Sequence, residues 1–149
     1  MEAMSDEHMR EEIIRITNAC GTCILVTYGL DGYPNARVLE DHNVADDLVF
    51  WLATSARTGK VAEIRANPKV GLMYWLADEG KYVHVMAEAT IVEDQEVRTE
   101  HFREHWYQYW PDGPTSPDYV LMRFDPAEFV VYHSGELGYF PPHWKPEER

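Results

Sequence analysis

Residues 46–70 of the chain are Asp-Asp-Leu-Val-Phe-Trp-Leu-Ala-Thr-Ser-Ala-Arg-Thr-Gly-Lys-Val-Ala-Glu-Ile-Arg-Ala-Asn-Pro-Lys-Val. The run from Leu48 to Ala53 is apolar and of strand length, and it ends among hydroxyl and cationic side chains. A short helix is expected next, with Thr58 as N-cap and Asn67-Pro68 as its end, because proline disfavours helical backbone in the residue before it. Such a helix start has unpaired amide hydrogens and a positive dipole end. The stretch therefore predicts an anion site, and phosphate is the anion we expect.

A further cation lies on the strand expected before this one. Pairing of neighbouring strands can bring Arg37 to the same end of the sheet as Lys60. Two cations beside a helix start would strengthen a phosphate site. The alternative is that Arg57, Thr58 and Lys60 are only caps and solvated charges, and the motif alone does not decide between the two.

Composition limits the classes of partner. The chain has 149 residues, enough for one domain, and 26 acidic against 13 basic residues give a net charge of −13. A surface this acidic repels nucleic acids and anionic membranes, so neither is expected as a partner. No apolar run reaches the roughly 18 residues of a membrane span, and the first residues lack the features of a signal peptide. We therefore expect a cytoplasmic protein.

The remaining pattern favours antiparallel strands. A helix is expected over 5–19, within an N-terminal segment 1–19, and a second over 93–109. Strands are expected over 20–28, 33–44, 48–53, 70–76, 81–92, 119–124 and 128–133, followed by an extended arm over 134–149. Six or so strands joined mainly by hairpins predict a mostly β fold, an antiparallel barrel with a few helices, formed by residues 1–149 as a single domain.

Two short motifs have other interpretations. Cys20 and Cys23 have a Cys-x-x-Cys spacing, but they follow a helix and enter a strand, the reverse of the thioredoxin order. Buried structural cysteines are therefore favoured over a redox pair. The sequence His101-Phe-Arg-Glu-His105 matches an inverted zinc-protease pattern. No third ligand is evident, so no metal site is expected.

The residues also resemble a known family, the FMN-binding split barrels related to pyridoxamine 5′-phosphate oxidase, and within it the bacterial general stress proteins. The resemblance covers residues 14–132. It is carried by Asp-Gly-Tyr-Pro-Asn-Ala-Arg37, Leu48-Val-Phe-Trp51, Thr54-Ser55, Thr58-Gly-Lys60, Val61-Ala-Glu-Ile-Arg-Ala-Asn-Pro68, Tyr82-Val-His-Val and Tyr109-Trp-Pro-Asp-Gly-Pro-Thr-Ser-Pro117. It implies a six-stranded antiparallel split barrel that forms a homodimer with two FMN sites at the subunit interface.

The resemblance also implies roles for individual residues. Arg37, Thr58 and Lys60, with Gly59 between the last two, match phosphate-binding positions. Val38 and Leu39 would lie along the flavin ring, and Thr54 and Ser55 would border the ring or the ribityl chain. Tyr82 and the loop with Trp110 would come from the other subunit. No catalytic residue is assigned, because a flavin carries its own redox chemistry.

The chain departs from the family pattern at several places, among them His42 in place of a basic flavin contact, Ala87 in place of a common glycine, and a spacing from Trp51 to Lys60 that is about two residues longer than in the oxidase. Glu40 and Asp41 are more acidic than the usual continuation after the arginine, and residues 138–146 do not resemble the elements that hold pyridoxamine phosphate. We therefore expect an FMN-dependent oxidoreductase of unknown substrate that does not oxidise vitamin B6. A flavin-binding storage, sensor or stress-related protein without turnover stays open, as does a split barrel that binds deazaflavin or haem.

Overall fold

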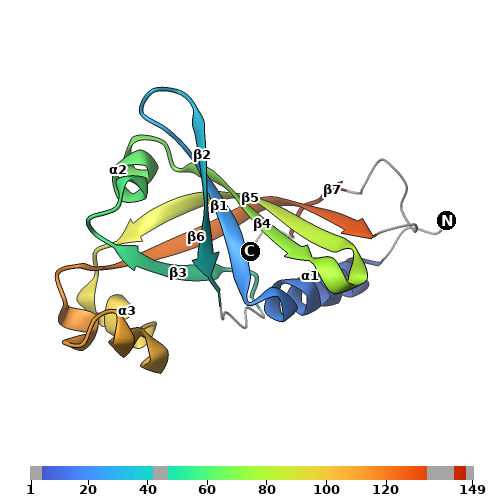
Figure 1. Ribbon diagram of the computed structural model, residues 1–149. Coiled ribbons are helices and arrows are strands. Elements are labelled where there is room, and N and C mark those ends of the chain that lie inside the picture. The colour runs from blue at the N-terminus through green and yellow to red at the C-terminus, as the bar shows by residue number, and fades with distance from the viewer. Residues whose placement is uncertain (1–4, 42–46, 134–142, 147–149) are drawn as a thin grey trace.

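The computed structural model describes residues 5–41, 47–133 and 143–146, and within them a strongly curled antiparallel sheet with helices at its ends (Figure 1). The helices are α1 (Asp6–Cys20), α2 (Gly59–Ala66) and α3 (Gln95–Glu100), with single 3₁₀ turns η1 (Ala77–Glu79), η2 (Glu104–Gln108) and η3 (Gly113–Thr115). The strands are β1 (Thr22–Tyr28), β2 (Pro34–Glu40), β3 (Phe50–Ser55), β4 (Lys69–Leu76), β5 (Lys81–Val92), β6 (Tyr119–His133) and β7 (His143–Trp144).

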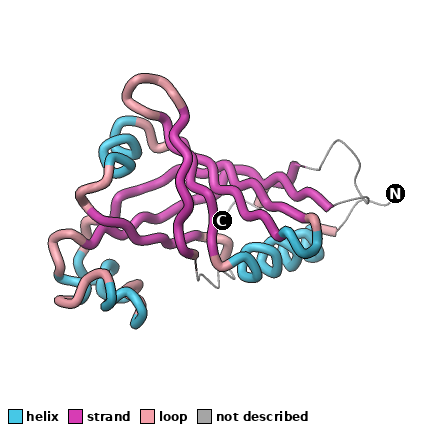
Figure 2. The backbone as a smooth tube through the Cα atoms, in the orientation of Figure 1, coloured by secondary structure: helices cyan, strands magenta, loops and turns pink. Residues whose placement is uncertain are grey.

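The sheet is a split barrel. Its strand order is β2-β1-β4-β5-β6-β3, every pairing is antiparallel, and the short β7 pairs with β6. Right-handed twist curls the sheet (Figures 1 and 2), so that residues of β2 and of the end of β3, at opposite ends of this order, line one pocket. The predicted barrel of six strands is confirmed, with β7 as an addition.

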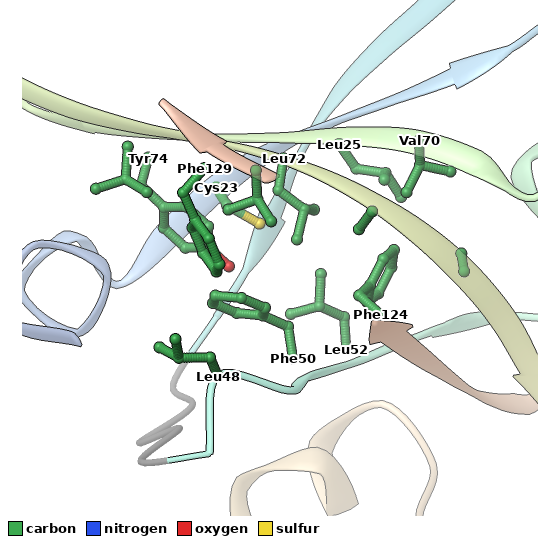
Figure 3. Packing of buried hydrophobic residues seen from close by; sticks show 14 of the residues in the cluster. Cys23, Leu25, Leu48, Phe50, Leu52, Val70, Leu72, Tyr74, Phe124 and Phe129 are labelled. Carbon is green, nitrogen blue, oxygen red and sulfur yellow. The ribbon is translucent and has the colours of Figure 1, made fainter. Parts of the chain in front are cut away.

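The core fills the concave side of the sheet. Strand alternation turns Leu25, Leu72, Val85 and Phe50 inward, where each is almost completely buried. Figure 3 shows Leu25, Leu72 and Phe50 meeting between strands that are far apart in the sequence. Helix α1 is capped by Ser5, whose side chain accepts a hydrogen bond from the amide of His8. Its buried face is Met9, Ile13, Ile16 and Thr17, and it contacts β4 and β5.

The expected helix over 93–109 is wrong in its middle. Asp94 caps the helix by accepting from the amides of Glu96 and Val97, and the helix ends at Glu100. Phe102 then packs edge-on against Trp106 and Tyr119, which fits a turn but not a continuous helix. The residues with helical apolar spacing thus form two short helical segments, α3 and η2, with a turn between them. His101 and His105 do not lie one turn apart on a single helix.

Strand β6 differs from the two strands expected over 119–124 and 128–133. It is one strand of 15 residues. Between the two expected strands there is a bulge: Met86 pairs with Glu128 and Ala87 with Pro126, which leaves Ala127 as the extra residue. Proline is accommodated because the ladder is already interrupted there.

The expected extended arm is partly packed. Within 134–149 the structure describes residues 143–146; Trp144 contacts Phe129 with ring centroids 5.7 Å apart, and its indole N–H donates to Asp6. The arm is therefore joined to β6 and to α1, and the rest of it lies outside the described residues. Among the helices that the structure describes, none has the length and apolar character needed to cross a bilayer.

Candidate functional site

A pocket of about 560 Å³ lies between β2, the end of β3 and the segment that contains η2 and η3. One wall is aliphatic, from Val38, Leu39 and Ala53, and the facing wall is aromatic, from Trp106, Tyr109 and Trp110. Pockets of this size and character suit small organic ligands. Six residues that the sequence assigned to one site line it: Val38, Leu39, Thr54, Ser55, Thr58 and Trp110.

Lys60 lies behind one wall of this pocket. Helix α2 packs Val61 and Ile64 into the core, which carries the Lys60 side chain inward until it is only 7% exposed. Its Nζ donates to the Thr54 hydroxyl at 2.7 Å. Burial lowers the pKa of Lys60, the nearby Arg37 guanidinium lowers it further, and Glu63 acts in the opposite direction. Lys60 is thus a buried cation whose nearest hydroxyl faces the pocket.

Arg37 reaches the same region from β2, but not by the strand pairing that was expected, since β2 and β3 stand at opposite ends of the strand order. Its guanidinium donates to the Thr27 hydroxyl at 2.7 Å and to Glu63 on α2 at 3.1 Å. The Asn35 side-chain amide donates to the other oxygen of Glu63 at 2.6 Å. The strands and α2 therefore bring Arg37 and Lys60 together, and they add a buried acid that the sequence interpretation missed. A local signal existed, because Glu63 is three residues after Lys60, a spacing at which helical side chains are neighbours.

The turn between β3 and α2 holds its hydroxyls by internal contacts. Thr58 occupies the N-cap position but makes no side-chain cap; its hydroxyl donates to the Ser55 carbonyl at 2.9 Å. The Thr54 and Thr58 hydroxyl oxygens are 3.4 Å apart. Gly59 is the first residue of α2. The predicted cap is wrong in this detail, and Thr58 is instead one of three hydroxyls at the edge of the pocket.

Asp118 is a second residue that the sequence interpretation missed. Its carboxylate accepts from the Ser55 hydroxyl at 2.6 Å, from Arg57 Nε at 3.2 Å and from the Trp110 indole at 3.2 Å. The Ser55 bond is the main cause that lowers the pKa of Asp118, and Arg57 and Trp110 add to it. Asp118 directly precedes Tyr119, which pairs with Ser55. Only this cross-strand register shows that the acid joins Arg57 to the aromatic wall.

The two residues assigned to a second subunit lie in different places. Trp110 lines the pocket of its own chain, so a partner is not needed to bring it there. Tyr82 is not among the lining residues; it stacks on Tyr132, with ring centroids 5.0 Å apart. At the mouth of the pocket the Tyr109 hydroxyl donates to Glu40 at 3.2 Å and links the two walls.

The two cysteines have the properties of structural residues. Both thiols are free, Cys23 is buried, and burial raises its pKa to about 12. A thiol with a raised pKa is a poor nucleophile at neutral pH. In residues 5–41, 47–133 and 143–146, no three His, Cys, Asp or Glu side chains are grouped as metal ligands would be.

Comparison with known families identifies the chain's relatives. Residues 9–132 match the family model described as pyridoxamine 5′-phosphate oxidase. The chain belongs to this family. Its split barrel agrees with the fold that the resemblance implied.

Two curated relatives are similar in sequence. General stress protein 26 of Bacillus subtilis is 28% identical over 108 residues, which cover 70% of this chain and 75% of the relative. The pyridoxine/pyridoxamine 5′-phosphate oxidase of Thermosynechococcus vestitus is 29% identical over 124 residues, or 80% of this chain, but the match spans only 58% of that enzyme.

Two solved structures share the fold. A protein from Clostridium acetobutylicum related to general stress protein 26 has a TM-score of 0.83 at 20% identity, covering 95% of this chain and 96% of the other. A pyridoxamine 5′-phosphate oxidase-related FMN-binding protein of Nostoc punctiforme has a TM-score of 0.68 at 14% identity, covering 98% and 99%. At these identities the likeness establishes the fold alone.

Proposed function

We propose that the chain binds FMN in the pocket between β2, β3 and the η2–η3 segment. It acts as a cytoplasmic homodimeric oxidoreductase on a substrate other than vitamin B6. One observation carries the proposal: the pocket with its aliphatic and aromatic walls adjoins a buried lysine through the Thr54 hydroxyl, and an arginine is held beside that lysine by Glu63. A flat ring and a phosphate are what these two halves would accommodate.

The residues fit the two ends of FMN. Val38 and Leu39 would lie along the ring on one side, and Trp110 would close it on the other. Lys60 and Arg37, with the Thr54 and Thr58 hydroxyls, supply charge-assisted and neutral donors suited to a phosphate. A bound flavin would supply the electron transfer, and these side chains would orient it and exclude water from its ring.

The family supports a flavin, and the C-terminal segment supports a substrate other than vitamin B6. One solved protein of this fold, from Nostoc punctiforme, is described as FMN-binding. In this chain Trp144 pairs and packs with Phe129 of β6 and contacts α1, away from the pocket lining. Residues 143–146 thus have a structural use, which favours a different substrate from that of the oxidase.

The outward face of the sheet favours a homodimer. Strand alternation turns Ile24, Met73, Trp75 and Tyr82 away from the core, and the registers Ile24↔Met73 and Trp75↔Tyr82 place them as neighbours, with His84 beside Met73 at the edge of this group. Trp75 is 54% exposed. A contiguous apolar sheet face of this kind is typical of an interface, and a second copy is the partner we propose.

The test is mass spectrometry of ligand extracted from natively purified protein, followed by titration of the stripped protein with FMN. Extracted FMN, or tight FMN binding on titration, would support the proposal. Deazaflavin or haem in the extract would identify that molecule, and not FMN, as the ligand of the site. An empty protein that binds no flavin would refute the proposal. A bound flavin that neither NADH nor NADPH reduces, and that reduces no acceptor, would favour a storage or sensor role.

A further inference from the structure

A buried acid lies among the cations of the proposed phosphate site. Glu63 is 6% exposed, and both of its oxygens accept hydrogen bonds, one from Arg37 and one from Asn35. It sits on α2 one helical turn after Lys60, and its charge acts on that lysine. A site built only to hold a phosphate dianion would gain from the cations and lose from this acid.

The charges of the site sum to about one positive unit. Arg37 and Lys60 contribute two cations and Glu63 one anion. Nearby ions on the same turn and helix are neutralised in pairs, Arg57 with Asp118 and Arg65 with Glu93. The inward residues of the strands that contact α2 add no charge, since they are Leu25 and Thr27 on β1 and Ala87 and Ala89 on β5; Glu88 of β5 is exposed on the other face.

We propose that Glu63 makes this site selective for a phosphate with a single negative charge, so that FMN binds preferentially with its phosphate monoprotonated. This inference rests on the proposed function. The second pKa of a phosphate monoester is about 6, so FMN is largely a dianion at neutral pH. A monoanion would neutralise the site, whereas a dianion would leave an excess negative charge in a partly buried place, which is costly. FMN binding above about pH 6 would then take up a proton.

The effect of Glu63 can be separated from the position of Arg37. Besides Glu63, the guanidinium donates to the Thr27 hydroxyl, to the Asn35 carbonyl at 3.0 Å and to the Leu25 carbonyl at 3.3 Å. These three acceptors belong to β1 and β2 and remain in a Glu63 variant. Glu63→Gln keeps the size of the side chain and removes its charge, so it changes the charge sum from about one to about two with Arg37 still held.

The experiment measures the dissociation constant of FMN for the full chain between about pH 5.5 and about pH 7.5, a range that brackets the second phosphate ionisation. Riboflavin, which has no phosphate, corrects for other effects of pH on the ring and the protein. In the wild type, FMN affinity relative to riboflavin should fall as pH rises. In Glu63→Gln it should stay level or rise, with FMN bound about tenfold more tightly than by the wild type at the upper pH.

Glu93→Gln is the matched control. Glu93 pairs with Arg65, which lies on α2 as Glu63 does, but Glu93 itself is exposed and outside the pocket lining. This variant should keep the wild-type profile. The inference would be overturned if wild-type FMN affinity rose with pH, or if Glu63→Gln kept the wild-type profile while flavin still bound. If Glu63→Gln does not fold, a wild-type FMN affinity that rises with pH still overturns the inference. Absence of binding by both FMN and riboflavin would instead refute the proposed function itself.

Discussion

The ammonium group of Lys60 donates a hydrogen bond to the hydroxyl of Thr54 at 2.7 Å. This bond joins the first turn of α2 to the end of β3. The lysine is buried, while Thr54 lines the pocket. This pair places a positive charge directly behind the part of the pocket lining that Ala53, Thr54 and Thr58 form. This contact connects the pocket proposed for the flavin ring with the cations proposed for the phosphate.

Replacing Lys60 with Ala should weaken FMN binding about tenfold or more and leave riboflavin binding nearly unchanged, because only FMN carries the phosphate that the ammonium would contact. Flavin fluorescence titrations of both ligands measure the effect. Lys145→Ala, an exposed lysine, is the control and should bind FMN as the wild type does. Equal FMN affinity in the wild type and in Lys60→Ala would remove the lysine from the phosphate site.

Trp110→Ala should act on the ring end of the ligand. The indole lines the pocket and donates to Asp118, so its loss should weaken FMN and riboflavin by similar factors, about five- to fiftyfold, as expected for a large aromatic contact. The same titrations test this, and Tyr107→Ala, an exposed aromatic outside the pocket lining, is the comparison. A loss confined to FMN would place Trp110 at the phosphate end.

Alkaline pH should destabilise the fold through Cys23. Burial raises the pKa of this thiol from 9.0 to about 12, so above about pH 9 the unfolded chain releases a proton that the native chain keeps. The free energy of unfolding should therefore be unaffected below pH 9 and fall as pH rises toward 12, by up to roughly 4 kcal/mol from this group. Tyr119, whose pKa burial also raises to about 12, adds to the slope above pH 10.

Urea unfolding at about pH 8 and about pH 10.5 measures this slope. Cys23→Ala should lower stability at pH 8 and reduce the further loss at pH 10.5. Cys20→Ala, at the more exposed end of the Cys-x-x-Cys spacing, should change the slope less. An unchanged slope in Cys23→Ala would mean that the thiol does not carry the effect.

Local pattern was enough for much of the fold. The alternation from Lys81 to Val92 defines β5 at both ends, and the proline at 68 defines the end of α2. The roles of Glu63 and Asp118 could not be predicted in this way. Each depends on a partner brought by another strand, Arg37 from β2 and Ser55 from β3, and so on the register of the sheet. The helix over 93–109 failed for the converse reason, since the apolar spacing around Phe102 also fits an aromatic cluster around a turn.

Trp75→Glu should shift the chain from dimer to monomer, since it introduces a charge into the outward apolar face proposed as the interface. Sedimentation velocity at several concentrations measures the assembly state. Leu30→Glu is a suitable control because Leu30 is 74% exposed in the β1–β2 turn. A wild type that sediments as a monomer, or a Trp75→Glu variant that stays dimeric, would contradict this interface.

Trp144→Ala should lower the free energy of unfolding by about 1–3 kcal/mol, because the side chain is half-buried and its loss removes contacts with two elements, β6 and α1. The ring packs on Phe129, the indole N–H donates to Asp6 at 3.0 Å, and the Arg10 guanidinium lies 5.8 Å from the ring centroid. Trp144→Phe should keep the packing and lose only the hydrogen bond and part of the cation contact, so its cost should be clearly smaller. Urea unfolding at pH 7 compares the two variants.

Since Trp144 does not line the pocket, both variants should bind FMN with wild-type affinity where they are folded. A variant that keeps full stability but loses FMN binding would instead place the C-terminal segment at the ligand.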